Sequence, residues 1–216
     1  RAIRQGRIIF TNIRKFIIYQ LSYHFGEILV IAAISFSLLK LPLLPLQLLF
    51  LNILLDVFPA LALGIGEGRA NIMDDPPKDP QEPIVHKKSW EAIIVYGVVI
   101  AAVITGAYFF VRFAWGYSHE VGNNVAFFAL GFSQLFHTLD MRDREEHWFN
   151  NQVTRNKYVW MAIAFGIVAM LAAYLVPFLK DILSIETLDA RVWVLIAIVS
   201  LVPMLINQVV KQVFKL

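Results

Sequence analysis

The sequence predicts an all-α integral membrane protein, a bundle of six transmembrane helices whose first helix extends beyond the membrane as a stalk. Of its 216 residues, 58% are hydrophobic and 16% are charged, whereas soluble domains carry about 45–50% and about 25%. The apolar residues gather in runs close to the length that crosses a bilayer, about 20 residues. Basic residues are distributed unevenly between these runs, which is typical of membrane proteins.

Six runs are candidate spans, and the fourth is the shortest and most polar. If the fourth run crosses the membrane, neighbouring helices must shelter it, because unpaired polar groups are costly in lipid. All five tryptophans (Trp90, Trp115, Trp148, Trp160 and Trp193) lie at or near the ends of runs, as expected at the membrane–water interface. The runs cover residues 16–39, 43–63, 91–111, 125–139, 159–178 and 192–210.

The first helix is expected to begin well before its span. Basic and apolar residues are interleaved from Arg1 to Phe16, so one unbroken helix can run from water into the membrane. A helix of about 39 residues would be about 58 Å long, nearly twice the thickness of a bilayer core, about 30 Å. The surplus is the stalk, which should meet another part of a larger assembly.

The basic residues indicate the orientation. With six spans, both termini lie on one side, and that side receives fifteen of the 19 Lys and Arg residues. The positive-inside rule therefore places both termini in the cytoplasm. On this side, residues 64–90 contain Pro76, Pro77, Pro80 and Pro83, which prevent a helix and favour extended backbone. This loop is expected to dock on a neighbouring domain.

Two classes of chemistry are excluded by composition. The chain has no cysteine, so it contains neither disulfides nor thiolate metal sites. No basic stripe alternates with aromatic residues, so nucleic acid is not an expected partner. The lipid bilayer is an expected partner.

Polar residues inside the first two runs indicate an ion site. A charged side chain in mid-membrane costs about 2.5–3.5 kcal/mol, so it is usually paired or functional. Glu27 lies in the first run with His24 three residues earlier, and Asp56 lies in the second with Asn52 four residues earlier. Each pair shares a helix face. Oxygen-rich sets of this kind suit hard cations such as Ca²⁺ or Mg²⁺.

Proline adds a backbone argument to the same region. Pro59 has no N–H to donate to the carbonyl of Leu55, and its ring clashes with that carbonyl. The second helix is therefore expected to loosen between Asn52 and Asp56, where freed carbonyl oxygens can serve as ligands. Broken helices in mid-membrane recur in transporters.

Each of these groups also has a purely structural interpretation. Asp56 with Asn52, and Glu27 with His24, can be hydrogen-bonded pairs that only join helices. For Gln134 in the fourth run both interpretations stay open, an ion ligand or a hydrogen-bond partner between helices. His137, Asp140 and Asn207 are interpreted as structural, the first two because they approach the cytoplasmic end.

Four runs carry a resemblance that covers the whole chain. They are similar to the C-terminal membrane region of cation-transporting P-type ATPases, the calcium-pump branch especially. Residues 2–19 resemble the start of that family's fifth transmembrane helix, 45–64 its sixth, 72–84 the loop that follows and 133–140 its eighth. The runs read AIRQGRIIFTNIRKFIIY, PLQLLFLNILLDVFPALALG, IMDDPPKDPQEPI and SQLFHTLD.

This resemblance implies that residues 1–216 form a C-terminal membrane domain that supplies helices five to ten of a pump. In the family, cations bind between helices four, five, six and eight, and Glu27, Asn52 and Asp56 match ligand positions. His24, Leu55 and Gln134 stand where a two-ion calcium pump has Asn, Thr and Glu. These departures favour one ion for each cycle or a different ion, and they make His24 a candidate proton carrier.

The resemblance also implies partners. The D-K-T-G-T and T-G-E-S motifs, the nucleotide-binding domain and helix four are missing from this sequence. The chain is thus expected to be a fragment or one of two chains, with ATP and Mg²⁺ bound in a phosphorylation domain outside it. The complete pump would transport a cation across the plasma membrane, and calcium is the first candidate. The rival interpretation is a non-enzymatic membrane subunit or a passive ion-conducting protein.

Overall fold

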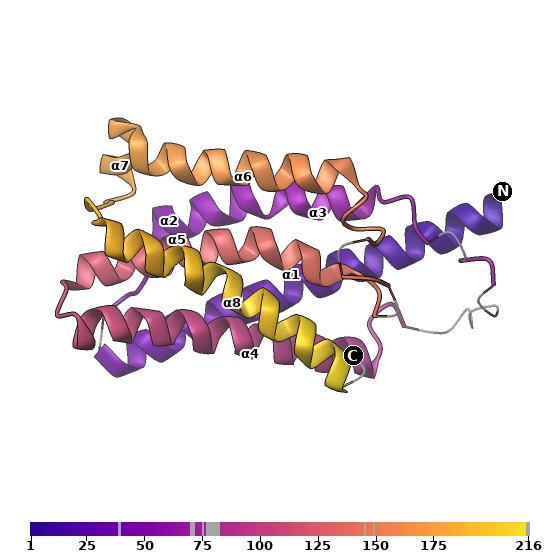
Figure 1. Ribbon diagram of the computed structural model, residues 1–216, viewed down its shortest axis with the longest axis horizontal. Helices are drawn as coiled ribbons and strands as arrows, with labels where there is room; N and C mark the ends of the chain where they lie inside the picture. The colour runs from indigo at the N-terminus through magenta and orange to yellow at the C-terminus, as the bar shows by residue number, and fades with distance from the viewer. Residues whose placement is uncertain are drawn as a thin grey trace.

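The computed structural model describes residues 1–38, 40–69, 72–74, 76, 83–144, 146–148 and 150–214. In these residues all regular structure is helical, and the long helices lie side by side along one axis (Figure 1). Of the four prolines predicted to extend the 64–90 loop, Pro77 and Pro80 fall outside the described residues. The helices are α1 (Ala2–Leu38), α2 (Pro45–Phe50), η1 (Leu51–Leu55), α3 (Val57–Gly64), α4 (Lys87–Phe109), η2 (Phe110–Ala114), α5 (His119–His137), η3 (Thr138–Met141), α6 (Lys157–Leu175), α7 (Pro177–Ile182) and α8 (Ala190–Phe214).

Five helical segments are long and apolar enough to cross a membrane. They are Ala2–Ser37, Pro45–Gly64, Lys87–Ala114, Lys157–Leu175 and Ala190–Val213. Each corresponds to one of the predicted spans. The fourth predicted span, 125–139, corresponds to α5, which begins earlier, at His119, and does not reach the same hydropathy. An all-helical multi-pass membrane fold is therefore confirmed, with α5 as an additional helix in the bundle.

α1 is one continuous helix of 37 residues, as the interleaved pattern predicts. Its first turns project beyond the ends of the other helices (Figure 1). Asn12, in the N-terminal part of α1, donates from Nδ2 to the carbonyls of Gly64 at 3.2 Å and Gly66 at 2.7 Å. The end of α3 is therefore fastened to the side of α1.

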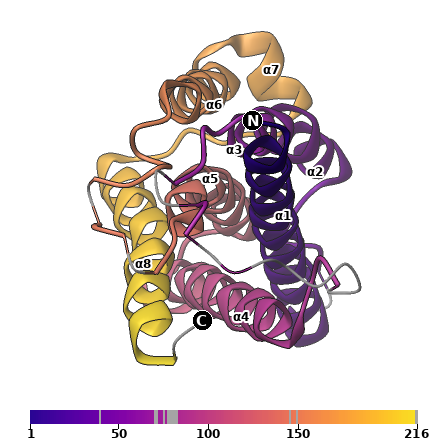
Figure 2. The same ribbon diagram turned by 90° about the vertical axis from the view of Figure 1, so that its right-hand side faces the viewer.

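α5 occupies the centre of the bundle, surrounded by the other long helices (Figure 2). Polar side chains in its first turns find partners there: Asn123 accepts from Gln47 Nε2 at 2.8 Å and donates to the carbonyl of Pro42 at 2.7 Å. Ser118 caps its first turn by accepting from the N–H of Val121. The neighbours thus provide the shelter that a polar helix in lipid needs.

The second predicted span is not a uniform α-helix. Between α2 and α3, residues Leu51–Leu55 wind as a π-helix, in which hydrogen bonds join residues five apart instead of four. The wider turn ends four residues before Pro59, which lacks the N–H that an α-helix would direct to Leu55. The predicted loosening is confirmed.

The end of the fifth predicted span needs correction. The apolar run extends to residue 178, but α6 ends at Leu175 and a new short helix, α7, begins at Pro177. Proline is favoured in the first turn of a helix and interrupts a helix that is already running. Composition alone does not separate these two helices.

Two glycines bring α1 and α4 together. A Cβ added at Gly97 would lie 2.7 Å from Phe25 Cδ1 and 2.9 Å from the carbonyl oxygen of Ser22, and one at Gly26 would lie 3.0 Å from the carbonyl oxygen of Gly97. Small residues allow this kind of close helix contact in membranes. The crossing holds in place the part of α1 that carries His24 and Glu27, two residues of the ion site predicted from the sequence.

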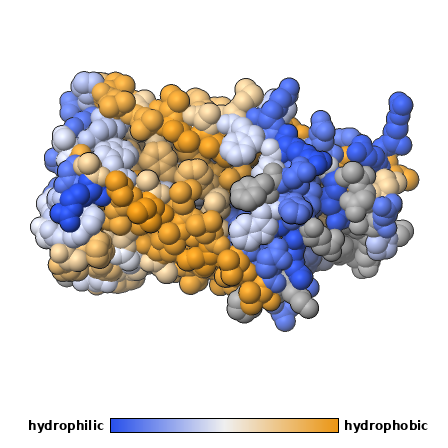
Figure 3. Space-filling view, in the orientation of Figure 1, coloured by the Kyte–Doolittle hydropathy of each residue, from blue (hydrophilic) through white to orange (hydrophobic). Residues whose placement is uncertain are grey.

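The outer surface matches a membrane setting. An apolar band covers the visible face over the middle of the helices, and hydrophilic surface follows at both ends, most extensively where α1 projects (Figure 3). Large exposed side chains such as Phe36, Leu175 and Phe178 would be unfavourable in water but suit contact with lipid tails.

Candidate functional site

The candidate site begins with two side chains of α1. Glu27 is buried, with 5% of its surface exposed, and His24 lies one turn earlier on the same face. His24 Nδ1 is 3.2 Å from Glu27 Oε2, and His24 Nε2 is 3.2 Å from Asp56 Oδ2 on the facing helix. The imidazole therefore bridges two carboxylates from different helices.

The π-helix positions the second part of the site. Asp56 stands at the junction of η1 and α3, and only 5% of its surface is exposed. Asn52 lies one turn earlier on η1, and its Oδ1 is buried without a hydrogen-bond partner among the described residues. Pro59 has no N–H to donate to the carbonyl of Leu55, so this carbonyl is a further candidate ligand next to Asp56.

The third part comes from the sheltered helix α5. Gln134 is fully buried and donates from Nε2 to Asp56 Oδ1. Its own backbone carbonyl lies 3.4 Å from the hydroxyl of Tyr19 on α1. His24, Glu27, Asp56 and Gln134 thus form one connected chain across three helices. The structure brings four of the five predicted side chains into direct contact.

Three of the five predicted site residues carry a buried oxygen without a hydrogen-bond partner among the described residues: Glu27 Oε1, Asn52 Oδ1 and Gln134 Oε1. Buried polar atoms are nearly always paired, so unpaired ones call for a specific explanation such as a bound ion. Carboxylate and amide oxygens are the ligands that hard cations prefer. The donor set therefore fits an oxygen-coordinated cation.

The set is not a complete metal site by itself. Among the described residues, no three His, Asp or Glu side chains are grouped so that they could hold a metal ion. Two carboxylates and two amides leave several positions to be filled, since Ca²⁺ takes six to eight oxygen ligands.

Sequence reasoning missed several neighbours of the site. Gln20 Nε2 lies 3.0 Å from His24 Nε2, and the buried hydroxyl of Tyr23 has no hydrogen-bond partner among the described residues. The Tyr23 ring meets the edge of the His24 ring, with centroids 5.9 Å apart. The i, i+4 spacing of Gln20 and His24 is a signal that could have identified the first of these.

A second buried polar network lies closer to the projecting end of α1. His137 Nε2 is 2.7 Å from Ser22 Oγ, and His137 Nδ1 is 2.8 Å from Asp140 Oδ2. Asp140 also accepts from Asn207 Nδ2 at 3.1 Å and from Gln208 Nε2 at 2.9 Å. These hydrogen bonds join α1, α5, η3 and α8 to one another. They favour the structural role predicted for His137, Asp140 and Asn207.

Long apolar helices around connected carboxylate, imidazole and amide groups define this chain as an integral, multi-pass membrane protein with an internal polar site. The family model described as "Cation transporting ATPase, C-terminus" matches residues 40–213. The chain therefore belongs to this family. The match includes Asn52, Asp56 and Gln134, whereas His24 and Glu27 precede it.

Curated relatives extend the similarity over nearly the whole chain. The calcium-transporting ATPase 1 of Bacillus cereus is 29% identical over 226 residues, covering 98% of this chain and 25% of that protein. The calcium-transporting ATPase of Bacillus subtilis is 32% identical, covering 94% and 23%. The calcium-transporting ATPase 1 of Yarrowia lipolytica is 31% identical, covering 90% and 22%. The chain thus spans about a quarter of the length of these relatives.

Proposed function

We propose that this chain is part of the membrane domain of an ATP-driven cation pump and that calcium is the transported ion. The observation that carries the proposal is the connected chain of His24, Glu27, Asp56 and Gln134 with its unpaired buried oxygens. An isolated structural cluster would normally satisfy its acceptors internally. The names of the relatives, all calcium-transporting ATPases, support the choice of ion.

The proposed topology has six spans, with α5 as the sheltered fourth and both termini in the cytoplasm of a cell whose plasma membrane holds the pump. The distribution of Lys and Arg supports this orientation. The apolar band and the large hydrophilic surface around the projecting part of α1 (Figure 3) support it too. In this arrangement the first turns of α1 form the cytoplasmic stalk.

The ligand set is proposed to be completed from outside this chain. Glu27, Asn52, Asp56 and Gln134 would supply side-chain oxygens, and a preceding membrane helix of the same pump would supply the remaining ligands. ATP and Mg²⁺ would act in a cytoplasmic phosphorylation domain, which is the proposed partner of the stalk. The loop over residues 67–90 would brace this domain; its residues 70, 71, 75 and 77–82 lie outside the described part of the chain.

Contacts of the stalk suggest how phosphorylation would reach the site. Asn12 holds the end of α3 at Gly64 and Gly66, and Arg14 Nε donates to the carbonyl of Ile84 at 2.8 Å. A force applied to the stalk would therefore move α1 together with the chain that follows η1. Because this movement reaches Glu27 through α1 and Asp56 through α3, which the π-helix η1 separates from α2, the alignment of the two carboxylates with Asn52 would change with the state of the pump.

His24 is proposed to limit the site to one cation and to carry a proton. A protonated imidazole donates from both nitrogens, which would satisfy Glu27 and Asp56 together. A cation bound to the same carboxylates would remove the need for that proton. Proton release on cation binding, and its reversal on the other side, would then follow from competition for two oxygens.

The test is Asp56→Asn in the full-length pump that contains this chain. We expect calcium-dependent phosphorylation by ATP to be abolished, because the substitution removes the charge shared by His24 and the cation. Asp181→Asn is the matched control, since Asp181 is exposed on α7. If Asp56→Asn is phosphorylated and transports as the wild type does, the site assignment fails.

The rival function is tested by reading the gene upstream of Arg1. An in-frame D-K-T-G-T segment supports the pump. A start codon directly upstream supports a separate non-enzymatic or passive ion-conducting subunit.

A further inference from the structure

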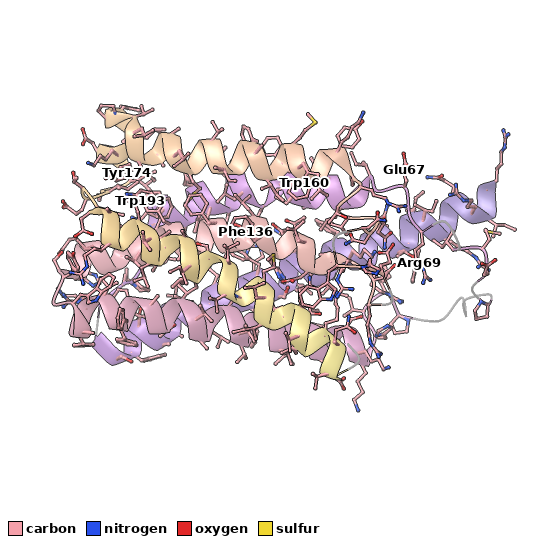
Figure 4. All side chains as sticks on the ribbon, viewed as in Figure 1. Glu67, Arg69, Phe136, Trp160, Tyr174 and Trp193 are labelled. Carbon is pink, nitrogen blue, oxygen red and sulfur yellow. The ribbon has the colours of Figure 1, made fainter. Side chains whose placement is uncertain are left out.

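A basic cavity lies at the end of the bundle where α1 projects, apart from the candidate ion site. Its volume is about 420 Å³, and α1, α4, η3 and α8 contribute to its walls. Seven of its sixteen lining residues are Arg or Lys, and only two are Asp. Arg69, one of the lining residues, lies at this end of the bundle, whereas Tyr174 and Trp193 lie at the other end (Figure 4).

Both carboxylates of the cavity are already engaged. Asp143 is 3.1 Å from Lys15 Nζ and 3.6 Å from Arg69 Nε. Asp140 accepts hydrogen bonds from Asn207 and Gln208 and contacts His137. The excess positive charge is therefore not neutralised by the acidic residues that line the same walls.

Two of the cations are buried among neutral partners. Lys211 is 7% exposed and donates to the backbone carbonyls of Asp140 and Arg142. Arg142 is 2% exposed; its Nε donates to Gln208 Oε1 at 2.7 Å, and its Nη1 donates to backbone carbonyls. Burying a cation whose direct hydrogen-bond partners are all neutral is costly, so an anion in the cavity would relieve this cost.

Arg142 also has an unused donor. Its Nη2 is buried and has no hydrogen-bond partner in the described part of the chain. An arginine donor fork of this kind binds phosphate and carboxylate groups. The guanidinium is held in place by Gln208 and by the Trp148 ring, whose centroid is 5.7 Å from Cζ. The donor is thus pre-positioned rather than free to turn away.

The level of the cavity favours a lipid phosphate. The hydrophilic surface at this end begins where the apolar band stops (Figure 3). Trp90, half exposed, follows the lining residue Ser89 directly, and tryptophan is enriched at the headgroup level of membranes. Basic pockets between membrane helices on the cytoplasmic side bind the headgroups of anionic lipids.

We propose that this cavity binds a phosphate group, supplied by the headgroup of an anionic phospholipid. Arg142 donates from Nη2, and Lys15 and Lys211 supply buried positive charge. Lys88 and Arg144, both exposed at the rim, attract the headgroup. The proposal concerns binding and does not depend on the pump function.

The experiment measures lipid bound to the full-length protein in detergent by native mass spectrometry. The protein is titrated with dioleoylphosphatidylglycerol, with dioleoylphosphatidylcholine and with inorganic phosphate in separate arms. The test variant is Lys88→Gln with Arg144→Gln. The control is Lys87→Gln with Arg155→Gln, which removes the same charge from exposed residues that do not line the cavity.

We expect phosphatidylglycerol to bind in preference to phosphatidylcholine, and affinity to fall about fivefold for each charge removed, or roughly 25-fold for the test variant. The control should bind as the wild type does. Saturation by inorganic phosphate, with displacement of the lipid, would support the phosphate site but assign it to a soluble ligand.

Equal binding by test and control variants, or no preference between the two lipids and no phosphate binding, would overturn the proposal. Arg142→Met should weaken binding further, and its thermal unfolding midpoint reports whether it has folded. Because Lys88 and Arg144 are exposed, the rim variant still tests binding at the cavity if Arg142→Met does not fold.

Discussion

Replacing Gly97 with alanine is expected to force α1 and α4 apart. The new Cβ would lie 2.7 Å from Phe25 Cδ1, 2.9 Å from the carbonyl oxygen of Ser22 and 3.1 Å from the backbone nitrogen of Gly26. The phenyl ring can turn aside, but the two backbone atoms can retreat only if α1 moves. Overpacking of this kind costs about 1–3 kcal/mol.

Gly106 supplies the matched control on the same helix. A Cβ added there meets nothing within 4 Å, so Gly106→Ala should gain only the helix propensity of alanine, about 1 kcal/mol. The same propensity gain applies at Gly97. The difference between the two variants therefore isolates the packing cost and should be about 1–3 kcal/mol.

The assay is equilibrium unfolding of the full-length protein in mixed micelles with increasing sodium dodecyl sulfate. A second measurement is calcium affinity, because Gly26 immediately precedes Glu27 and displacement of α1 would move that carboxylate. Calcium affinity should fall in Gly97→Ala and stay unchanged in Gly106→Ala. Equal stabilities of the two variants would refute a tight crossing at Gly97.

Three further predictions concern the polar groups. His24→Gln should reduce the dependence of calcium affinity on pH, measured as calcium-activated phosphorylation between pH 6 and 8, because no imidazolium then competes for Glu27 and Asp56; an unchanged pH profile would argue against proton competition. Gln134→Glu should lower the thermal unfolding midpoint without calcium, because it places a carboxylate against Asp56 Oδ1 in place of an amide donor, and calcium should restore much of the loss; equal midpoints with and without calcium would remove Gln134 from the ion site. The Tyr117 hydroxyl donates to Asp189 and holds the pKa of that exposed carboxyl below its usual range. The hydrogen bond therefore stabilises the folded protein above about pH 4, and this contribution is lost as pH falls through the depressed pKa. Tyr117→Phe should raise the Asp189 pKa in an NMR titration. An unchanged pKa would exclude this hydrogen bond as the cause.

The parts of the site that the sequence predicts are those with a local cause. His24 and Glu27 share a face because three residues make nearly one helical turn, and Pro59 disturbs the helix before it because it lacks an N–H. Both consequences appear in the structure, as the imidazole–carboxylate contact and the π-helix. Such causes act within one helix, so they can be worked out without knowing its neighbours.

The parts that the sequence does not predict depend on contacts between helices. That His24 would reach Asp56 as well as Glu27 depends on how α1 and η1 face each other. The burial of Arg142 depends on α8, which supplies Gln208 from 66 residues away in sequence. A second π-helix, η2 at Phe110–Ala114, has no proline to indicate it. Hydropathy likewise conceals the break at Pro177, because both flanking segments are apolar.

The π-helix Leu51–Leu55 makes the length of this segment matter more than its composition. A turn of this kind accommodates one more residue than an α-helix does. Deleting a single residue there would close the segment into a regular α-helix, and the wide turn that ends at Asp56 would be lost. Gln47, which joins this helix to Asn123 and to the carbonyl of Leu183, would keep its face, so the loss would fall on the oxygens at Asn52 and Asp56. Conservative substitutions of Leu51, Ile53 and Leu54 should therefore be tolerated where a one-residue deletion is not.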